Sequence, residues 1–320
     1  MESFLSIAET TLRTVTPLLL AALAGLFVER SGIIEISLEG KMLAASFVAA
    51  VVAHATGSPW LGVSCALLCT LAIAMLHGLV VIHYRGDQLI AGVAINFAVA
   101  GVTPVLALAW FGDETTSPRL EDVNRLKEIV LPGAEQAAST PVIGEAYARL
   151  ISGHSAITYL AMAIVPLAVW TIYQSRFGLR LRAAGSNPHA LDTAGISVGR
   201  TRLLALVCGS VLCALAGSFI SLSSNSGWVQ NMTAGKGYLA LAAVVFAQWR
   251  PVPTVLVCFM FALTDAFQLR LQNVELPGIG IIPSDFIQML PYVLTVLLLA
   301  GVAGRARAPK AIGIPFEKSR

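Results

Sequence analysis

The sequence predicts an all-α polytopic membrane protein with about eight or nine transmembrane segments, some of them short or broken. Of its 320 residues, 56% are hydrophobic and only 12% are charged, whereas soluble domains average about 25% charged residues. The mean hydropathy is +0.77. Several windows hold about 17–25 consecutive, mostly apolar residues, enough to cross a bilayer as a helix. We therefore expect one transmembrane domain over residues 1–320.

The first membrane segment is expected between Thr16 and Val28. Glu2 is the first charged residue, so the chain lacks the basic start of a cleavable signal peptide, and residues 1–30 are expected to be retained. The stretch from Met1 to Arg13 is expected to form an interfacial amphipathic segment. A full crossing by residues 16–28 would leave the N-terminus outside, whereas a re-entrant half-helix would leave it in the cytoplasm. Both interpretations stay open.

The remaining segments are separated by turn residues and short polar stretches. Helices are expected at 42–53, 60–82, 88–110, 156–173 and 203–221, a half-span at 238–249, and two further helices at 254–267 and 286–300. Ala45, Ala49 and Ala53 form a small-residue stripe that favours close helix contact. A weak similarity between 86–98 and 235–247 suggests inverted repeats, because the two segments are expected to run in opposite directions.

The distribution of charge predicts the orientation in the membrane. Residues 175–202 carry five arginines against one acid, whereas residues 111–155 carry seven acids against four bases. Because basic loops stay in the cytoplasm, 175–202 and the basic C-terminal tail are expected inside, and 111–155 is expected to be an extracytoplasmic loop. An aromatic belt is expected from the tryptophans at segment ends. These are Trp60, Trp110, Trp170, Trp228 and Trp249.

No motif for enzymatic chemistry is present in the sequence. Gly235-Lys236 is followed by Gly237 and not by Ser or Thr, so there is no P-loop for ATP. There is also no G-x-S-x-G, no H-E-x-x-H and no Cys/His cluster. No catalytic residue and no metal site are predicted, and we expect a transport subunit that is not an enzyme. The basic segment lacks the aromatic platforms of a nucleic-acid site, so no nucleic-acid partner is expected.

Polar side chains at membrane depth are the candidates for a solute path. They are Glu35, Glu39, Gln88, Asn96, Asp265 and Gln268. An aspartate inside a membrane costs about 2.5–3.5 kcal/mol, so Asp265 is expected to face a wet cavity or a partner. Glu35 and Glu39 indicate either a broken helix that lines the path or the cytoplasmic interface, and the sequence does not choose between them.

The middle of the basic segment predicts a short helix. Ser186 and Asn187 are good caps, and Pro188 suits the first helical position. Because the chain has no ATP motif of its own, this cytoplasmic segment is the expected contact with an external energy source.

Seven segments occur in an order that points to one family. They are Glu29–Gly40 (ERSGIIEISLEG), Gly86–Asn96 (GDQLIAGVAIN), Phe177–Ala190 (FGLRLRAAGSNPHA), Ala240–Phe246 (ALAAVVF), Asp265–Gln272 (DAFQLRLQ), Gln288–Thr295 (QMLPYVLT) and Gly304–Pro309 (GRARAP). Together they resemble permease subunits of bacterial ABC importers for nucleosides and simple sugars, within the ribose-type, branched-chain amino acid permease-like family. The resemblance covers about residues 25–310, and its first two segments are more similar to the nucleoside branch.

The resemblance implies a translocation path for nucleosides or related sugar-containing solutes, formed with a second homologous permease in the bacterial inner membrane. A separate cytoplasmic ATPase would bind ATP and Mg²⁺, so this chain would hold no cofactor. An extracytoplasmic binding protein would deliver the solute, and membrane lipid would surround the chain. The resemblance adds Phe246 to the path candidates. It also implies a coupling helix to the ATPase, with the residues Ser186, Asn187, Pro188, His189, Ala190, Leu191 and Ala194.

Two other classes compete with this interpretation. An ion-coupled secondary transporter of a small polar solute would need a coupling site, for which Glu35, Glu39 and Asp265 are the candidates. A membrane scaffold without a solute path would tolerate loss of Asn96 and Asp265.

Overall fold

The computed structural model describes residues 2–112, 116–134, 143–271, 275–276, 280–281, 289, 293, 296–297 and 308–318. Its long helices are α1 (Glu2–Arg30), α2 (Leu38–Thr56), α3 (Pro59–Gly78), α4 (Gln88–Phe111), α7 (Ala156–Gln174), α8 (Arg176–Ser186), α10 (Val198–Phe219), α11 (Lys236–Phe246) and α12 (Pro251–Leu271). Short helical pieces are η1 (Leu79–His83), η2 (Asp122–Asn124), α6 (Ile143–Ala146), η3 (Tyr147–Ile151), α9 (Pro188–Thr193) and η4 (Ile220–Ser224). Two antiparallel pairs join β1 (Glu128–Ile129) to β2 (His154–Ser155) and β3 (Glu275–Leu276) to β4 (Gly280–Ile281).

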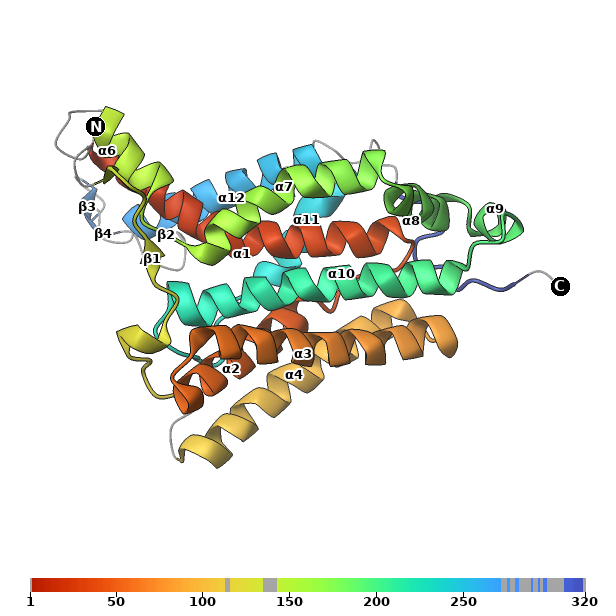
Figure 1. Cartoon of the computed structure of the whole chain (residues 1–320), viewed down its shortest axis with the longest axis horizontal. Coiled ribbons are helices and arrows are strands. Elements are labelled where there is room, and N and C mark those ends of the chain that lie inside the picture. The colour runs from red at the N-terminus through yellow and green to blue at the C-terminus, as the bar shows by residue number, and fades with distance from the viewer. Residues whose placement is uncertain are drawn as a thin grey trace.

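Helix α1 lies at the centre of the bundle and packs along α10 (Figure 1). Helices α2, α3 and α4 lie on one side of this pair, and α7, α11 and α12 lie on the other. Residues 15–29 of α1 are all buried. Apart from Thr16 and Glu29 they are apolar or small, and a helix of that kind belongs in a core. The predicted interfacial segment before Arg13 is not a separate element, since α1 is one continuous helix from Glu2 onward.

The two ends of α1 lie at opposite ends of the molecule (Figure 1). Near its start, Arg13 forms an ion pair of 2.8 Å with Glu128 of the acid-rich segment. At its other end Arg30 touches Gly185 of the basic segment, where an added Cβ would lie 2.3 Å from the Arg30 carbonyl oxygen. At 1.5 Å per residue, its 29 residues extend for about 44 Å, more than the hydrocarbon thickness. Helix α1 is therefore long enough to cross fully, and its start lies beside the acid-rich segment 111–155.

Seven helices of the described chain are long and apolar enough to span a membrane. They are Leu5–Arg30, Leu38–Thr56, Pro59–His83, Gln88–Phe111, Ala156–Gln174, Val198–Ser224 and Pro251–Leu271. The shorter α11 matches the predicted half-span. These helices confirm the all-α polytopic fold, while the predicted segment 286–300 lies outside the described residues.

Small residues bring α2 and α3 close together, as the alanine stripe predicts. Ala45, Ala49 and Ala53 are fully buried. Across from them Gly62 lies so near that an added Cβ would be 2.5 Å from the Ala49 carbonyl oxygen. The absence of a side chain at Gly62 is therefore what permits this backbone contact.

Only three of the five tryptophans lie where the predicted aromatic belt requires them. Trp60, Trp110 and Trp170 are more than half exposed at helix ends, where an amphipathic ring suits the membrane interface. Trp228 is fully buried and lies edge-on to Phe47, with ring centroids 5.0 Å apart. Trp249 is also buried, and its indole N–H donates to the Glu29 carboxylate of α1. These last two tryptophans stabilise the core.

Candidate functional site

Asn96 of α4 joins α4 to α2 and α11 through its side-chain amide. Its Oδ1 accepts a hydrogen bond from the Gly40 amide at 2.8 Å. Its Nδ2 donates to the Ile36 carbonyl at 2.9 Å and to the Tyr238 hydroxyl at 3.1 Å. The side chain on α4 thereby ties the start of α2 to the first turn of α11. Since all these bonds are internal, the amide of Asn96 is committed to packing in this conformation.

Glu39 holds the start of the half-span α11. Its Oε1 accepts from the Gly235 amide at 2.9 Å and from the Thr233 hydroxyl at 2.6 Å, and its Oε2 accepts from the Gly237 amide at 2.7 Å. These amides belong to the first turn of α11, where a helix leaves donors unpaired and favours negative charge. The carboxylate therefore stabilises a helix that begins inside the membrane protein and not at its surface.

Glu35 lies at the break between α1 and α2 and faces the packed interior. Lys41 donates to Glu35 Oε2 at 2.8 Å, and Ser37 donates to Oε1. His77 Nδ1 of α3 lies 3.8 Å from the same carboxylate. All four side chains are buried, so Glu35 lines no open path in this conformation.

Gln88 and Phe246 are also packed inside. Gln88 accepts from the Ile34 amide at 2.8 Å, which joins the start of α4 to the α1–α2 break. Its Nε2 is buried without a partner among the described residues. Phe246 lies edge-on to Phe261 of α12, with ring centroids 6.2 Å apart. Neither residue opens to a cavity that could admit a polar solute.

Asp265 and Gln268 of α12 line a polar pocket of about 390 Å³. Lys236, at the start of α11, faces this pocket, and its Nζ lies 3.8 Å from Asp265 Oδ2. Arg13 closes the pocket toward the acid-rich segment, and Asn225 adds an amide. The pocket therefore combines an anionic acceptor, cationic donors and amides that can do both. It lies at the end of the bundle where Arg13 pairs with Glu128 of the acid-rich segment.

The predicted path residues, which are the six polar side chains and Phe246, thus separate into two groups. Asp265 and Gln268 reach a common cavity. The others hold the frame of the bundle: Glu39 and Asn96 hold the start of α11, Glu35 and Gln88 hold the α1–α2 break, and Phe246 packs against α12. Sequence reasoning missed Lys236 and Tyr238, which connect the two groups. A lysine between two glycines at the start of a half-span was the signal that could have identified them, because a charge at that depth needs a partner.

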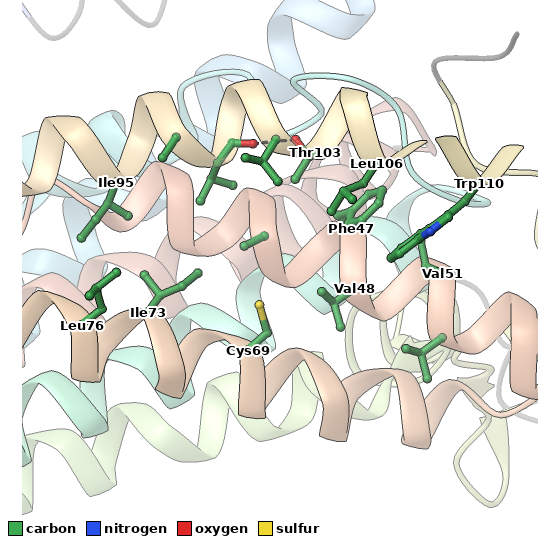
Figure 2. A pocket seen from close by; sticks show the side chains of 15 residues that line it. Phe47, Val48, Val51, Cys69, Ile73, Leu76, Ile95, Thr103, Leu106 and Trp110 are labelled. Atoms are coloured by element: carbon green, nitrogen blue, oxygen red, sulfur yellow. Dashed lines mark hydrogen bonds between the residues drawn. The ribbon is translucent and has the colours of Figure 1, made fainter. Parts of the chain in front are cut away.

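A second cavity, of about 410 Å³, separates α4 from α2 and α3. Figure 2 shows apolar side chains such as Ile95, Ile73 and Val48 around it. The hydroxyl of Thr103 is already used, since it donates to the Val99 carbonyl at 2.8 Å. This cavity offers no polar partner to a hydrophilic solute, so it does not suit the path.

The basic segment folds as two consecutive helices, α8 and α9. Sequence reasoning expected only the second. The Asn187 side chain accepts from the Ala190 amide at 3.1 Å, and Pro188 takes the first position, so the predicted cap is confirmed. Leu191 is buried and anchors α9, whereas His189 and Ala190 face outward. Ser186 and Ala194 bound the short helix and are exposed as well.

The C-terminal segment 308–318 fastens these two helices to the bundle. The Ala311 amide donates to the Gly185 carbonyl at 2.8 Å, and the Gly313 amide donates to the Gly32 carbonyl at 3.1 Å. Phe316 packs beside His189, with ring centroids 5.4 Å apart. The end of α8, the end of α1 and the tail therefore form one junction.

Comparisons with known proteins agree with this architecture. Residues 7–301 match the family described as branched-chain amino acid transport system, permease component. The chain is 31% identical to the guanosine ABC transporter permease protein NupQ of Bacillus subtilis, covering 98% of this chain and 97% of NupQ. It is 30% identical to the nucleoside ABC transporter permease protein NupC of Lactococcus lactis, over 95% and 94%. It is also 34% identical to a putative glucose ABC transporter permease protein of Haloferax volcanii, over 83% and 78%. No solved structure matches the chain.

Proposed function

This chain belongs to the family of branched-chain amino acid transport system permease components, and we propose that it conducts nucleosides across the membrane. It is the multi-pass permease subunit of an ABC transporter, a class that works with an ATPase and a binding protein. The proposal rests on one observation above the others. Two relatives named for guanosine or nucleoside transport match it over nearly the whole length of each protein.

The pocket beside Asp265 suits a solute of this class. A nucleoside carries ribose hydroxyls, which donate well to a carboxylate, and base edges that pair with amides. Asp265, Gln268 and Lys236 supply such partners. With the acid-rich segment outside, as its charge predicts, this pocket would suit a solute delivered by a binding protein. We propose that a second copy or a homologous permease completes the path on the other side.

We propose further that α9 is the contact with the ATPase and that its movement reaches the pocket through packed contacts. Helix α8 meets the end of α1 where Gly185 touches Arg30. Arg30 donates to the Trp249 carbonyl at 2.6 Å, and Glu29 accepts from the Trp249 indole at 2.5 Å. Trp249 follows α11, whose first turn carries Lys236. A push on α9 thus has a continuous route to the half-span that borders the pocket.

The test is uptake of labelled guanosine by cells that carry the complete transporter and no other nucleoside uptake system. Replacing Asp265→Asn should lower uptake about 10- to 100-fold, because a hydrogen bond to a charged group contributes about 1.5–3 kcal/mol. Asp122→Asn, a matched change at an exposed acid, should leave uptake unchanged. If both variants take up guanosine at the same rate, Asp265 is not part of the path.

The same cells decide between the remaining candidates. Uptake should persist when a protonophore removes the proton gradient and ATP is preserved, and its loss would favour ion coupling through Asp265. The relative named for glucose makes a simple sugar the second candidate substrate. Excess unlabelled glucose should leave guanosine uptake intact. If the transporter takes up glucose but not guanosine, its substrate is a simple sugar.

A further inference from the structure

A groove of about 490 Å³ lies between η1 with the end of α3 and the start of α10, at the cytoplasmic end of the molecule. One part of its wall is apolar, formed by Met75, Leu79 and Leu203. The other part is basic, formed by Arg85, Arg200 and Lys318. The two kinds of side chain are separated along the membrane normal, because the basic residues come from the ends of spans and from the tail.

The basic part carries excess positive charge. Arg85 pairs with Glu317 at 2.8 Å, and both side chains are substantially exposed, so this contact neutralises one charge weakly. Arg200 and Lys318 have no ion-pair partner among the described residues. His83 also lines the groove. A phosphate group at this place would meet at least two unneutralised cations.

The apolar part lies within the spans and faces outward. Met75 is 47% exposed and Leu79 is 45% exposed, and both belong to the span Pro59–His83. A soluble protein docked on the cytoplasmic face would meet the basic residues but would leave these side chains uncovered. A ligand that fills both parts must be anionic at one end and apolar at the other.

We propose that this groove binds an anionic phospholipid of the cytoplasmic leaflet, with its phosphate between Arg200 and Lys318 and an acyl chain along Met75 and Leu79. Basic pockets between transmembrane helices on the cytoplasmic side suit such headgroups. The inner leaflet supplies the ligand at high local concentration. The groove is distinct from the polar pocket beside Asp265, and it adjoins α9 through Phe316, which packs beside His189.

Two glycines give the groove its depth. At Gly78 an added Cβ would lie 3.0 Å from Leu203, so the backbone of α3 approaches α10 closely there. At Gly199 an added Cβ would meet only Ile82, at 3.4 Å. Gly199→Val should therefore fold while it narrows the groove, and this variant alters its shape without altering its charge.

The first test measures lipid retained by the purified protein, by native mass spectrometry after exchange into phosphatidylglycerol or phosphatidylcholine. Wild-type protein should retain phosphatidylglycerol preferentially. The double variant Arg200→Gln, Lys318→Gln should bind it about 30-fold more weakly, since each basic residue near a membrane surface contributes about a factor of five. Gly199→Val should also weaken the binding of phosphatidylglycerol. Arg180→Gln, an exposed arginine of α8 away from the groove, should retain wild-type binding.

Three outcomes would overturn the proposal. Equal retention of phosphatidylglycerol by wild type and the double variant would place the lipid elsewhere. If millimolar inorganic phosphate stabilises the purified protein as much as phosphatidylglycerol does, the ligand of the groove is a soluble anion. Loss of ATPase co-purification in the double variant with unchanged lipid retention would assign the groove to the ATPase.

Discussion

Lys41 and Glu35 form an ion pair that is shielded from water at the break between α1 and α2. Loss of one partner would leave the other charge buried and uncompensated, which costs about 3–5 kcal/mol. We therefore expect Glu35→Gln or Lys41→Met to lower the free energy of unfolding by about that amount, measured by denaturant titration in mixed micelles. The double variant should lose less than either single variant, because no lone charge remains. A double variant that loses the sum of both would contradict this.

Gly237 occupies a position where no side chain fits. An added Cβ would lie 2.5 Å from the Glu39 amide nitrogen and 2.8 Å from its carboxylate. Gly237→Ala must therefore push the first turn of α11 away from α2 and weaken the three hydrogen bonds to Glu39. We expect guanosine uptake to fall at least tenfold, along with a lower melting temperature of the purified protein.

The matched control for Gly237 is Gly101→Ala on α4, since an added Cβ there meets nothing within 4 Å. Alanine favours helix over glycine by about 1 kcal/mol, so this variant should be neutral or slightly more stable. If both alanine variants keep wild-type uptake, the close contact between Glu39 and α11 is not needed for transport.

At the scale of the elements, the apolar periodicity predicted the spans well because length and hydropathy decide them. The expected helix 88–110 is α4 within one residue, and the half-span at 238–249 is α11. Helix α8 was missed because it is amphipathic and basic. Its buried face, with Gly178, Leu181 and Ala184, is recognised only once α7 and α1 are in place.

Helix α9 allows a sharp test of coupling, because its outward side carries an exposed alanine. Ala190 is exposed, so Ala190→Glu should leave membrane insertion and purification yield unchanged. The added charge should impair ATPase docking and lower guanosine-stimulated ATP hydrolysis and uptake together, by tenfold or more. Asn187→Asp retains the helix cap but adds a charge, and it should act in the same direction.

The control for α9 is the same substitution at the other end of the bundle. Ala55 is an exposed alanine at the end of α2, and Ala55→Glu should transport normally. If Ala190→Glu shows normal coupled transport, α9 is not the contact with the ATPase.

Across the whole molecule, composition was sufficient for the fold class, while the orientation of the basic segment stays a prediction from charge. The candidate site was predicted only in part. Asp265 and Gln268 were selected because polar groups at membrane depth are costly. Their partner Lys236 comes from a different element and meets them only after α11 folds back into the bundle. Contacts of that kind depend on tertiary packing, which periodicity along one helix does not encode.

The N-terminus is predicted to lie outside the cell, although the sequence alone left its side open. The ion pair between Arg13 and Glu128 places the start of α1 beside the acid-rich segment, while the basic segment is expected in the cytoplasm because of its charge. A single cysteine at Ser6→Cys, in a background without the five native cysteines, should react with a membrane-impermeant maleimide in intact cells. Ala194→Cys should react only after permeabilisation. If Ala194→Cys is labelled in intact cells and Ser6→Cys is protected, the topology is the opposite of the predicted one. The pocket beside Asp265 would then lie in the cytoplasmic half.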